Sequence, residues 1–191
     1  MRSSLSAVFW LALAAHAGAQ SREAKVVAAN GVEVSVWADE FSGRYEFAAP
    51  AIEAGDGFVF VSRVDEAGVV GSVRLTGGFV YMGDWRYYNR ALFRGGEEAE
   101  FVERGRDVGS CRARSGCSLN ESFAVLVRAS DLERHSRDGR IDVQVRAREA
   151  GAETVFSVPV SHFEAVQEVA SRPRDTLVPP PYDKSMGPPR D

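Results

Sequence analysis

The chain has 191 residues, of which 45% are hydrophobic and 26% are charged, and its formal net charge at pH 7 is −4. This length is enough for one domain with a sizeable hydrophobic core, so folding does not have to rely on disulfides. The mild acidity argues against a nucleic-acid partner, because such a partner calls for a clustered excess of basic residues.

The first nineteen residues have the features of a secretory signal peptide. Arg2 supplies a positive start, Leu5 to Ala15 is an uncharged apolar stretch, and Ala17-Gly18-Ala19 provides the small side chains that signal peptidase accepts. The apolar stretch is shorter than the ~20 residues that cross a bilayer. We therefore expect residues 1–19 to be removed, which leaves a periplasmic or secreted protein with no transmembrane segment.

Apolar and polar residues alternate over much of the stretch from about residue 26 to residue 160, and this alternation predicts a β domain. The Phe58–Val61 run is apolar on both faces, as is typical of a central strand. Gly77-Gly78 and Gly95-Gly96 are interpreted as breaks between strands. The expected strands contain the segments 32–37, 58–61, 69–75, 79–82, 87–93, 99–102, 122–128, 140–149 and 154–160.

Two short helices are expected among these strands. Ser130-Asp131-Leu132-Glu133 has the pattern of a capping box, and Gly139 is placed to end the helix that follows. Ser161-His162-Phe163-Glu164 repeats the pattern near the end of the domain. Together the elements predict a mostly β fold, either an antiparallel β-sandwich or a partly open barrel of roughly seven to nine strands, with two short helices, one near the C-terminal end of the domain.

We expect a single β-rich domain over residues 20–170 and a disordered tail over residues 171–191. The tail is rich in proline and has few large apolar residues, so it cannot bury enough surface to fold and is expected to be partly polyproline II. Within it, Pro179-Pro180-Pro181-Tyr182 matches a ligand of WW-type domains, but an exported protein has no obvious partner of that kind.

Cys111 and Cys117 are the only cysteines, and two cysteines this close in an exported protein predict a disulfide. The alternative is a redox or metal pair, which the longer spacing and the lack of a neighbouring His-rich or Cys-rich segment disfavour. After removal of the leader the chain has two histidines. We interpret His135 as a solvated surface residue and His162 as a helix-start residue, and we expect no metal and no cofactor.

The segment Phe79–Phe93 has the most unusual composition, because aromatic residues with polar tips are clustered there with arginines. Such side chains suit flat contact surfaces. In a strand, Arg86 and Tyr88 would share one face. We therefore predict a candidate binding surface at Trp85, Arg86, Tyr88 and Arg90, with packing of the aromatic rings in the core as the alternative.

The segment from Arg104 to Arg114 is expected to be a loop that is rich in arginine, next to acidic residues that largely cancel its charge. One interpretation is a solvated hairpin face. The other is that the disulfide holds Arg112 and Arg114 in position to recognise an anionic group, since arginine binds carboxylate and phosphate through two parallel hydrogen bonds. These two arginines complete the candidate binding surface.

Sequence signatures of hydrolases are missing. The chain has no G-x-S-x-G segment, no HExxH segment and no S-x-x-K segment with its partner motifs. Asp56, between two glycines, and the segment that starts at Asp138-Gly139 lack the ligand spacing of calcium loops and are interpreted as turns. In its layout of leader, β domain and cysteine-closed loop, the chain resembles exported bacterial proteins, and this resemblance implies no activity.

The first functional hypothesis is an exported, non-enzymatic protein that binds another component of the cell envelope or the extracellular space, either a protein or a glycan. One alternative is a secreted hydrolase of envelope polymers that uses unidentified carboxylates. The other is an accessory module of a surface assembly that offers an open strand edge to a partner.

Overall fold

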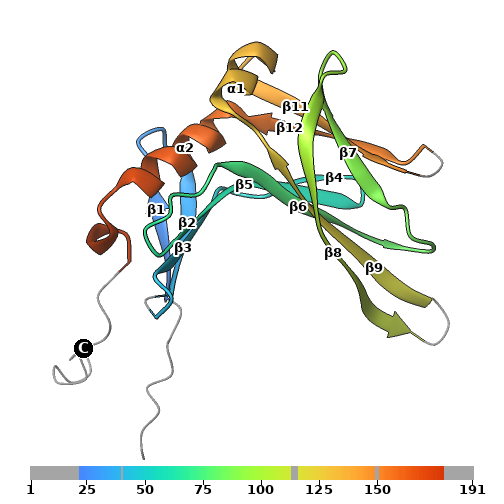
Figure 1. Ribbon diagram of the computed structural model, residues 1–191, viewed down its shortest axis with the longest axis horizontal. Helices are drawn as coiled ribbons and strands as arrows, with labels where there is room; N and C mark the ends of the chain where they lie inside the picture. The colour runs from blue at the N-terminus through green and yellow to red at the C-terminus, as the bar shows by residue number, and fades with distance from the viewer. Residues whose placement is uncertain (1–21, 40, 113–115, 149–150, 179–191) are drawn as a thin grey trace, which may run out of the picture.

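The computed structural model describes residues 22–39, 41–112, 116–148 and 151–178, with the backbone alone at Arg112. Most of these residues form antiparallel strands, and two α-helices accompany them (Figure 1). In chain order the elements are β1 (Arg22–Val27), β2 (Glu33–Asp39), β3 (Arg44–Ala48), β4 (Ile52–Ala54), β5 (Gly57–Glu66), β6 (Arg74–Met82), β7 (Tyr88–Phe93), β8 (Glu98–Arg112), β9 (Gly116–Leu126), α1 (Ala129–His135), β10 (Ser136–Arg137), β11 (Arg140–Ala147), β12 (Glu153–Pro159), α2 (Val160–Ser171) and the short 3-10 helix η1 (Arg174–Thr176).

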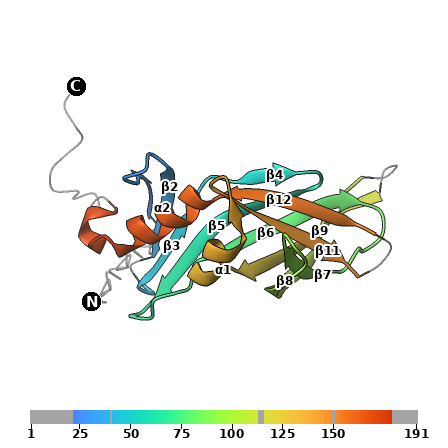
Figure 2. The same ribbon diagram turned by 90° about the horizontal axis from the view of Figure 1, so that it is seen from above.

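The strands pair in the order β1-β2-β3-β5-β6-β9-β8-β7-β11-β10, while β4 pairs with β5 and β12 pairs with β11. The long strand β8 joins the two halves of this sheet, because its first residues pair with β7 and its remainder pairs with β9. The sheet curls so that β12 runs beside β4 (Figure 2) and also contacts β5, and both halves contribute side chains to the core. The predicted fold class, a mostly antiparallel β-sandwich or partly open barrel with two helices, is confirmed.

A cluster of aromatic rings lies between the two halves of the sheet. Phe79 stacks on Tyr88 with ring centroids 3.7 Å apart, and on Phe123 at 5.5 Å, while Phe156 approaches from β12. None of these four side chains is more than 3% exposed. Because burial of a large apolar side chain contributes roughly 1.5–3 kcal/mol, this cluster is a main link between the halves.

Helix α2 covers the inner face of the sheet at β2, β3 and β5. Its buried residues include Phe163, Val166 and Val169, which recur at the spacing of one helix face. The helix begins at Val160, directly after Pro159, and no side chain caps it, so the expected cap at Ser161 is wrong.

His162 therefore lies inside the first turn of α2. Its Nδ1 atom is buried without a hydrogen-bond partner, and burial, reinforced by the charge of Arg140, lowers its pKa. The ring is thus held in the neutral form near pH 7.

A buried ion pair on β5 fastens the segment that follows α2. Arg63 Nε donates a hydrogen bond to Asp65 at 2.8 Å, and the two side chains are 6% and 8% exposed. Asp65 also accepts hydrogen bonds from the backbone N–H of Gly71 and from Arg174 of η1. The guanidinium of Arg174 in turn lies 4.8 Å from the ring centre of Tyr45.

This segment corrects the expected start of the tail at residue 171. Leu177 and Val178 are only 2% and 6% exposed and belong to the core, so the folded domain extends beyond α2. The Pro179–Tyr182 motif and the expected leader at residues 1–19 both lie outside the described residues.

The expected break at Gly77-Gly78 is wrong, because both glycines lie inside β6. Gly77 is opposite Val59, and a Cβ atom on Gly77 would lie 2.2 Å from the carbonyl oxygen of Phe58. Glycine is needed here for the close approach of β5 and not for a turn. Gly95 and Gly96, by contrast, form the predicted turn between β7 and β8, and both have positive φ.

The expected loop from Arg104 to Arg114 is largely a strand, because β8 continues to Arg112 in pairing with β9. This part of the hairpin extends past the core, so no buried alternating face marks it in the sequence, and Val108 is 58% exposed. Near its tip Cys111 lies opposite Cys117 with the two sulfur atoms 2.08 Å apart, so the predicted disulfide is confirmed.

Helix α1 begins earlier than expected. Its cap is a hydrogen bond of 2.8 Å from the backbone N–H of Arg128 to the carboxylate of Asp131, in place of the expected Ser130–Glu133 box. The helix ends at His135, and Gly139 instead forms the turn between β10 and β11 together with Asp138.

The interpretation of His135 as a solvated surface residue is wrong. Its side chain is 10% exposed, and its ring stacks on Phe93 with a centroid distance of 4.6 Å. Its Nε2 atom lies 3.3 Å from a carboxylate oxygen of Glu97, so the imidazole packs between a core ring and a surface acid.

Candidate functional site

The aromatic residues of the predicted binding surface do not form an exposed patch. Tyr88 is 3% exposed and stacks on Phe79 in the core. Trp85 is partly buried and packs against the same core. Tyr88 therefore follows the alternative interpretation, in which these rings pack inside the protein.

Two of the arginines predicted for this surface form ion pairs with acidic residues, and the side chains of the other two are not described. Arg86 forms an ion pair of 3.0 Å with Asp56, and Arg90 pairs with Glu98. Arg112 belongs to β8, with only its backbone described, and Arg114 lies outside the described residues.

The residues before β7 are held in place by Glu121, a buried carboxylate of β9 that the sequence did not single out. One carboxylate oxygen accepts a hydrogen bond from the hydroxyl of Tyr81, and the two oxygens together accept the backbone N–H groups of residues 86–88 at 3.0–3.1 Å. Arg106 Nε adds a further contact at 3.2 Å. Burial alone would raise the pKa of Glu121, but these donors outweigh it and the pKa is lowered.

This cluster has a structural role. Tyr87 adopts a left-handed backbone conformation with φ of +57°, which a non-glycine residue rarely adopts. Burial and the hydrogen bond to Glu121 raise the pKa of Tyr81 to about 12, so the hydroxyl remains a donor at ordinary pH. The carboxylate of Glu121 thus accepts hydrogen bonds from the hydroxyl of Tyr81 and from the backbone around Tyr87, and it holds this strained turn against the sheet.

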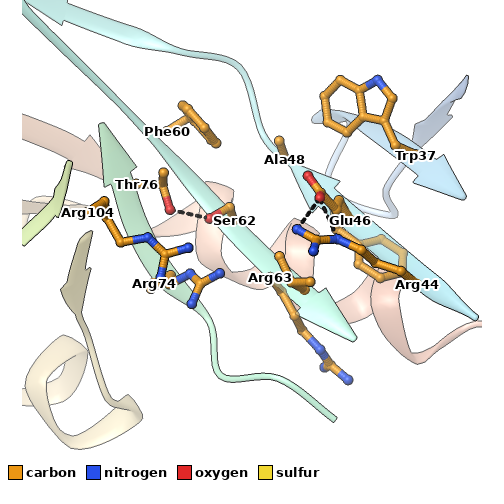
Figure 3. Close-up of a pocket in the computed structure, with 12 residues that line it drawn as sticks. Trp37, Arg44, Glu46, Ala48, Phe60, Ser62, Arg63, Arg74, Thr76 and Arg104 are labelled. Atoms are coloured by element: carbon orange, nitrogen blue, oxygen red, sulfur yellow. Dashed lines mark hydrogen bonds and ion pairs between the residues drawn. The ribbon is translucent and has the colours of Figure 1, made fainter. Parts of the chain in front are cut away.

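A groove lies on the outer face of the sheet, the face of Trp37 and Phe60, whose neighbours in sequence are buried in the core. Its volume is about 450 Å³, within the ~300–1,000 Å³ that is usual for ligand pockets. Five strands contribute to its lining, so residues far apart in the sequence meet here. The side chains that face the groove include Trp37, Arg44, Glu46, Phe60, Ser62, Arg74, Thr76 and Arg104 (Figure 3).

Arg74 and Arg104 lie next to each other in this groove (Figure 3). Neither guanidinium forms an ion pair or a hydrogen bond with another residue that the structure describes, and Nε of Arg74 is buried. Burial, followed by the charges of Arg104 and Arg44, lowers the pKa of Arg74. Since like charges repel in a partly desolvated site, an anion bound between these two groups would be stabilised.

Arg104 is placed by a β-bulge. The register of β8 on β9 shifts between Glu103 and Gly105, which leaves Arg104 as the extra residue of β8. A bulge of this kind changes the direction in which a side chain points. Strand β9 lies between β8 and β6, and its residue opposite Thr76 is Ala124, a short side chain that leaves room for long ones above it.

The other two arginines near the groove do not add free positive charge. Arg44 Nε donates to Glu46 at 2.7 Å, and its Nη1 donates to Glu66 at 2.9 Å. The side chain of Arg63 extends away from the groove to its partner Asp65 (Figure 3). The unneutralised charge of the groove therefore comes from Arg74 and Arg104.

No protein-family model, curated protein or solved structure matches this chain. In the described part of the chain, no helix is long and apolar enough to span a membrane. Within the same residues, no three His, Cys, Asp or Glu side chains come together as a group that could hold a metal ion.

Sequence reasoning missed the groove because its residues are dispersed over separate strands. One signal was present in β5, where Phe58 and Phe60 alternate with the inward-facing Val59 and Val61. The strand was correctly expected to be central. An aromatic residue on the outward face of this strand is also typical of a contact surface, and Phe60 does line the groove.

Proposed function

We propose that this protein is an exported, non-enzymatic binding protein that holds an anionic group, a carboxylate or a phosphate, between Arg74 and Arg104. The observation that carries the proposal is the pair of adjacent guanidinium groups, in a groove of ligand size, that have no acidic partner among the described residues. Guanidinium binds such anions through parallel hydrogen bonds, and each charged hydrogen bond contributes roughly 1.5–3 kcal/mol.

Export is supported by two independent features. The leader over residues 1–19 has the pattern that signal peptidase cleaves, and the disulfide between Cys111 and Cys117 is of the kind that persists in oxidising compartments. The ligand would accordingly be a component of the periplasm, the cell surface or the extracellular medium.

A hydrolase of envelope polymers is the alternative. Glycoside hydrolysis needs one carboxyl group whose pKa is raised beside a second carboxylate. The described carboxylates with shifted pKa values all shift downward, and they are Asp39, Asp65, Glu121, Asp142 and Glu168. Glu46, which lines the groove, is bound to Arg44. These features favour binding over acid–base catalysis.

An accessory module that recruits a partner through a strand edge is a second alternative. Strand β1 is at the end of the sheet and pairs only with β2 within the described residues. The groove, in contrast, has the volume of a ligand pocket and two arginines that can bind an anion, so it is the stronger basis for a function.

The proposal is tested by following the arginine Nε–Hε signals in NMR spectra while inorganic phosphate or citrate is added. We expect the signals of Arg74 and Arg104 to shift saturably, and Arg74→Gln or Arg104→Gln to weaken the affinity roughly tenfold or more. Arg90→Gln is the matched control, because Arg90 is exposed and lies on β7. Signals that do not shift, or the same affinity in the double variant, would refute the proposal, and turnover of a glycan would favour the hydrolase.

A further inference from the structure

The anion site is the middle of a longer groove. A second hollow of about 330 Å³ shares Trp37 and Phe60 with the first and continues to Pro50. A third hollow of about 380 Å³ shares Arg74 and Arg104 with the first and continues towards the turn after β5. Because adjoining hollows have lining residues in common, they form one path, which runs from Pro50 past two aromatic rings to the two arginines and on towards the turn after β5.

The aromatic part of this path offers flat apolar surface beside the positive charge. Trp37 is 36% exposed, although the residues on either side of it in β2, Val36 and Ala38, are fully buried. The ring of Phe60 is parallel to that of Phe58, with an angle of 5° between the planes. An exposed tryptophan beside a half-buried phenylalanine suits ligands that are themselves rings with one apolar face, as sugars are.

The floor of the groove restricts the ways in which a ligand can bind. Strands β3, β5 and β6 each pair with a neighbour on both sides, so their backbone groups are already hydrogen-bonded. A peptide therefore cannot bind here by adding a strand to the sheet. Recognition must come from side chains, which here are aromatic rings, small hydroxyls such as the Ser62–Thr76 pair, and the two arginines.

The charge of the groove is concentrated at one point. Outside Arg74 and Arg104, the charged residues that line the path form ion pairs with other described residues, for example Lys25 with Glu33 at 2.8 Å. A single-stranded nucleic acid carries one negative charge per nucleotide and would need cations along its whole length. A ligand with one anionic group among several uncharged rings matches this distribution better.

We infer that the ligand is an acidic oligosaccharide, of which one carboxylate or phosphate binds Arg74 and Arg104 while a neighbouring sugar ring lies on Trp37 and Phe60. This inference rests on the proposed anion-binding function and adds the class of molecule that carries the anion. The sugar ring would cover apolar surface that is now exposed to water, and the arginines would select acidic from neutral glycans.

The experiment is isothermal titration calorimetry of the mature protein with a short oligogalacturonate, a neutral oligosaccharide of equal length, and citrate. We expect the oligogalacturonate to bind more tightly than citrate, and the neutral sugar to bind weakly. Trp37→Ala should weaken oligogalacturonate binding about tenfold or more and change citrate binding by no more than about twofold. Phe41→Ala is the control, because Phe41 is 90% exposed in the turn after β2 and does not line the groove.

The outcomes separate this inference from the proposed function. If citrate and oligogalacturonate bind with equal affinity and Trp37→Ala affects neither, the sugar inference is refuted while the anion site stands. If polyglutamate or a single-stranded oligonucleotide binds more tightly than the oligosaccharide, the inferred class of ligand is wrong. If no anion binds the unmodified protein, both proposals fail. Retained citrate binding by Trp37→Ala shows that the variant is folded.

Discussion

Replacing Glu121 by glutamine tests the role of the buried carboxylate that holds the residues before β7. If the glutamine oxygen takes the place of the oxygen that meets Tyr81, its NH₂ group faces the donors of Tyr88 and Arg106. Two donors are then left without an acceptor, and each such loss costs about 1–3 kcal/mol. We therefore expect Glu121→Gln to lower the free energy of unfolding at pH 7 by about 2–4 kcal/mol.

The effect should depend on pH in a defined direction. The pKa of Glu121 is lowered in the folded state, so its ionised form contributes stability above the ordinary glutamate pKa of about 4.3. This contribution is lost as the pH falls through the folded-state pKa. Because glutamine does not titrate, the difference between the two proteins should be largest near pH 7 and should shrink below about pH 4.

The measurement is urea-induced unfolding of the two proteins, followed by circular dichroism between pH 3 and pH 7. Glu103→Gln is the control, since Glu103 also contacts Arg106 but is 46% exposed, and surface ion pairs contribute about 0–1 kcal/mol. A change of less than about 0.5 kcal/mol for Glu121→Gln at pH 7, or a difference that grows on acidification, would refute this reasoning.

Three other predictions concern stability. Replacing both Cys111 and Cys117 by serine should cost about 2 kcal/mol, because the closed loop is short, and thermal unfolding that shows no folded state would contradict this. Gly77→Ala should cost more than about 2 kcal/mol, since the added methyl group meets the backbone of β5, whereas Gly105→Ala has room and should be nearly neutral in urea unfolding. Asp65→Asn should lower the free energy of unfolding by about 3–5 kcal/mol, because it leaves the buried Arg63 without its charged partner. It should also speed hydrogen exchange in α2, and unchanged exchange would mean that this ion pair does not fasten the C-terminal segment.

Elements with one buried and one solvated face could be predicted closely from the sequence. In β11, Ile141, Val143 and Val145 are buried while the residues between them are not, so the alternation alone located the strand to within two residues. Strand β8 had no such signal beyond Val102, because it leaves the core and neither of its faces is buried there. Local alternation predicts a strand only where a core makes the two faces different.

The candidate site could not be predicted from the sequence, because it depends on register and on one irregularity of pairing. Arg74 and Arg104 are thirty residues apart, and they meet only because β9 pairs with both β6 and β8 and a bulge shifts Arg104. The clustering of aromatic residues and arginines in the sequence pointed instead to residues 79–93. In the structure, most of the aromatic rings of this segment pack in the core, while its arginines form ion pairs at the surface. Clustering in the sequence was therefore a poor guide to clustering in space.

The groove lies on the outward side of β3, β5 and β6, so these strands carry core residues on one face and groove residues on the other, and the buried Phe47 lines the groove as well. Under the proposed anion-binding function, substitutions at Glu46, Phe60 or Thr76 would change which ligands bind, while the inward residues continue to hold the sheet together. The selectivity of the proposed site could therefore be changed one outward position at a time while the residues of the core stay the same.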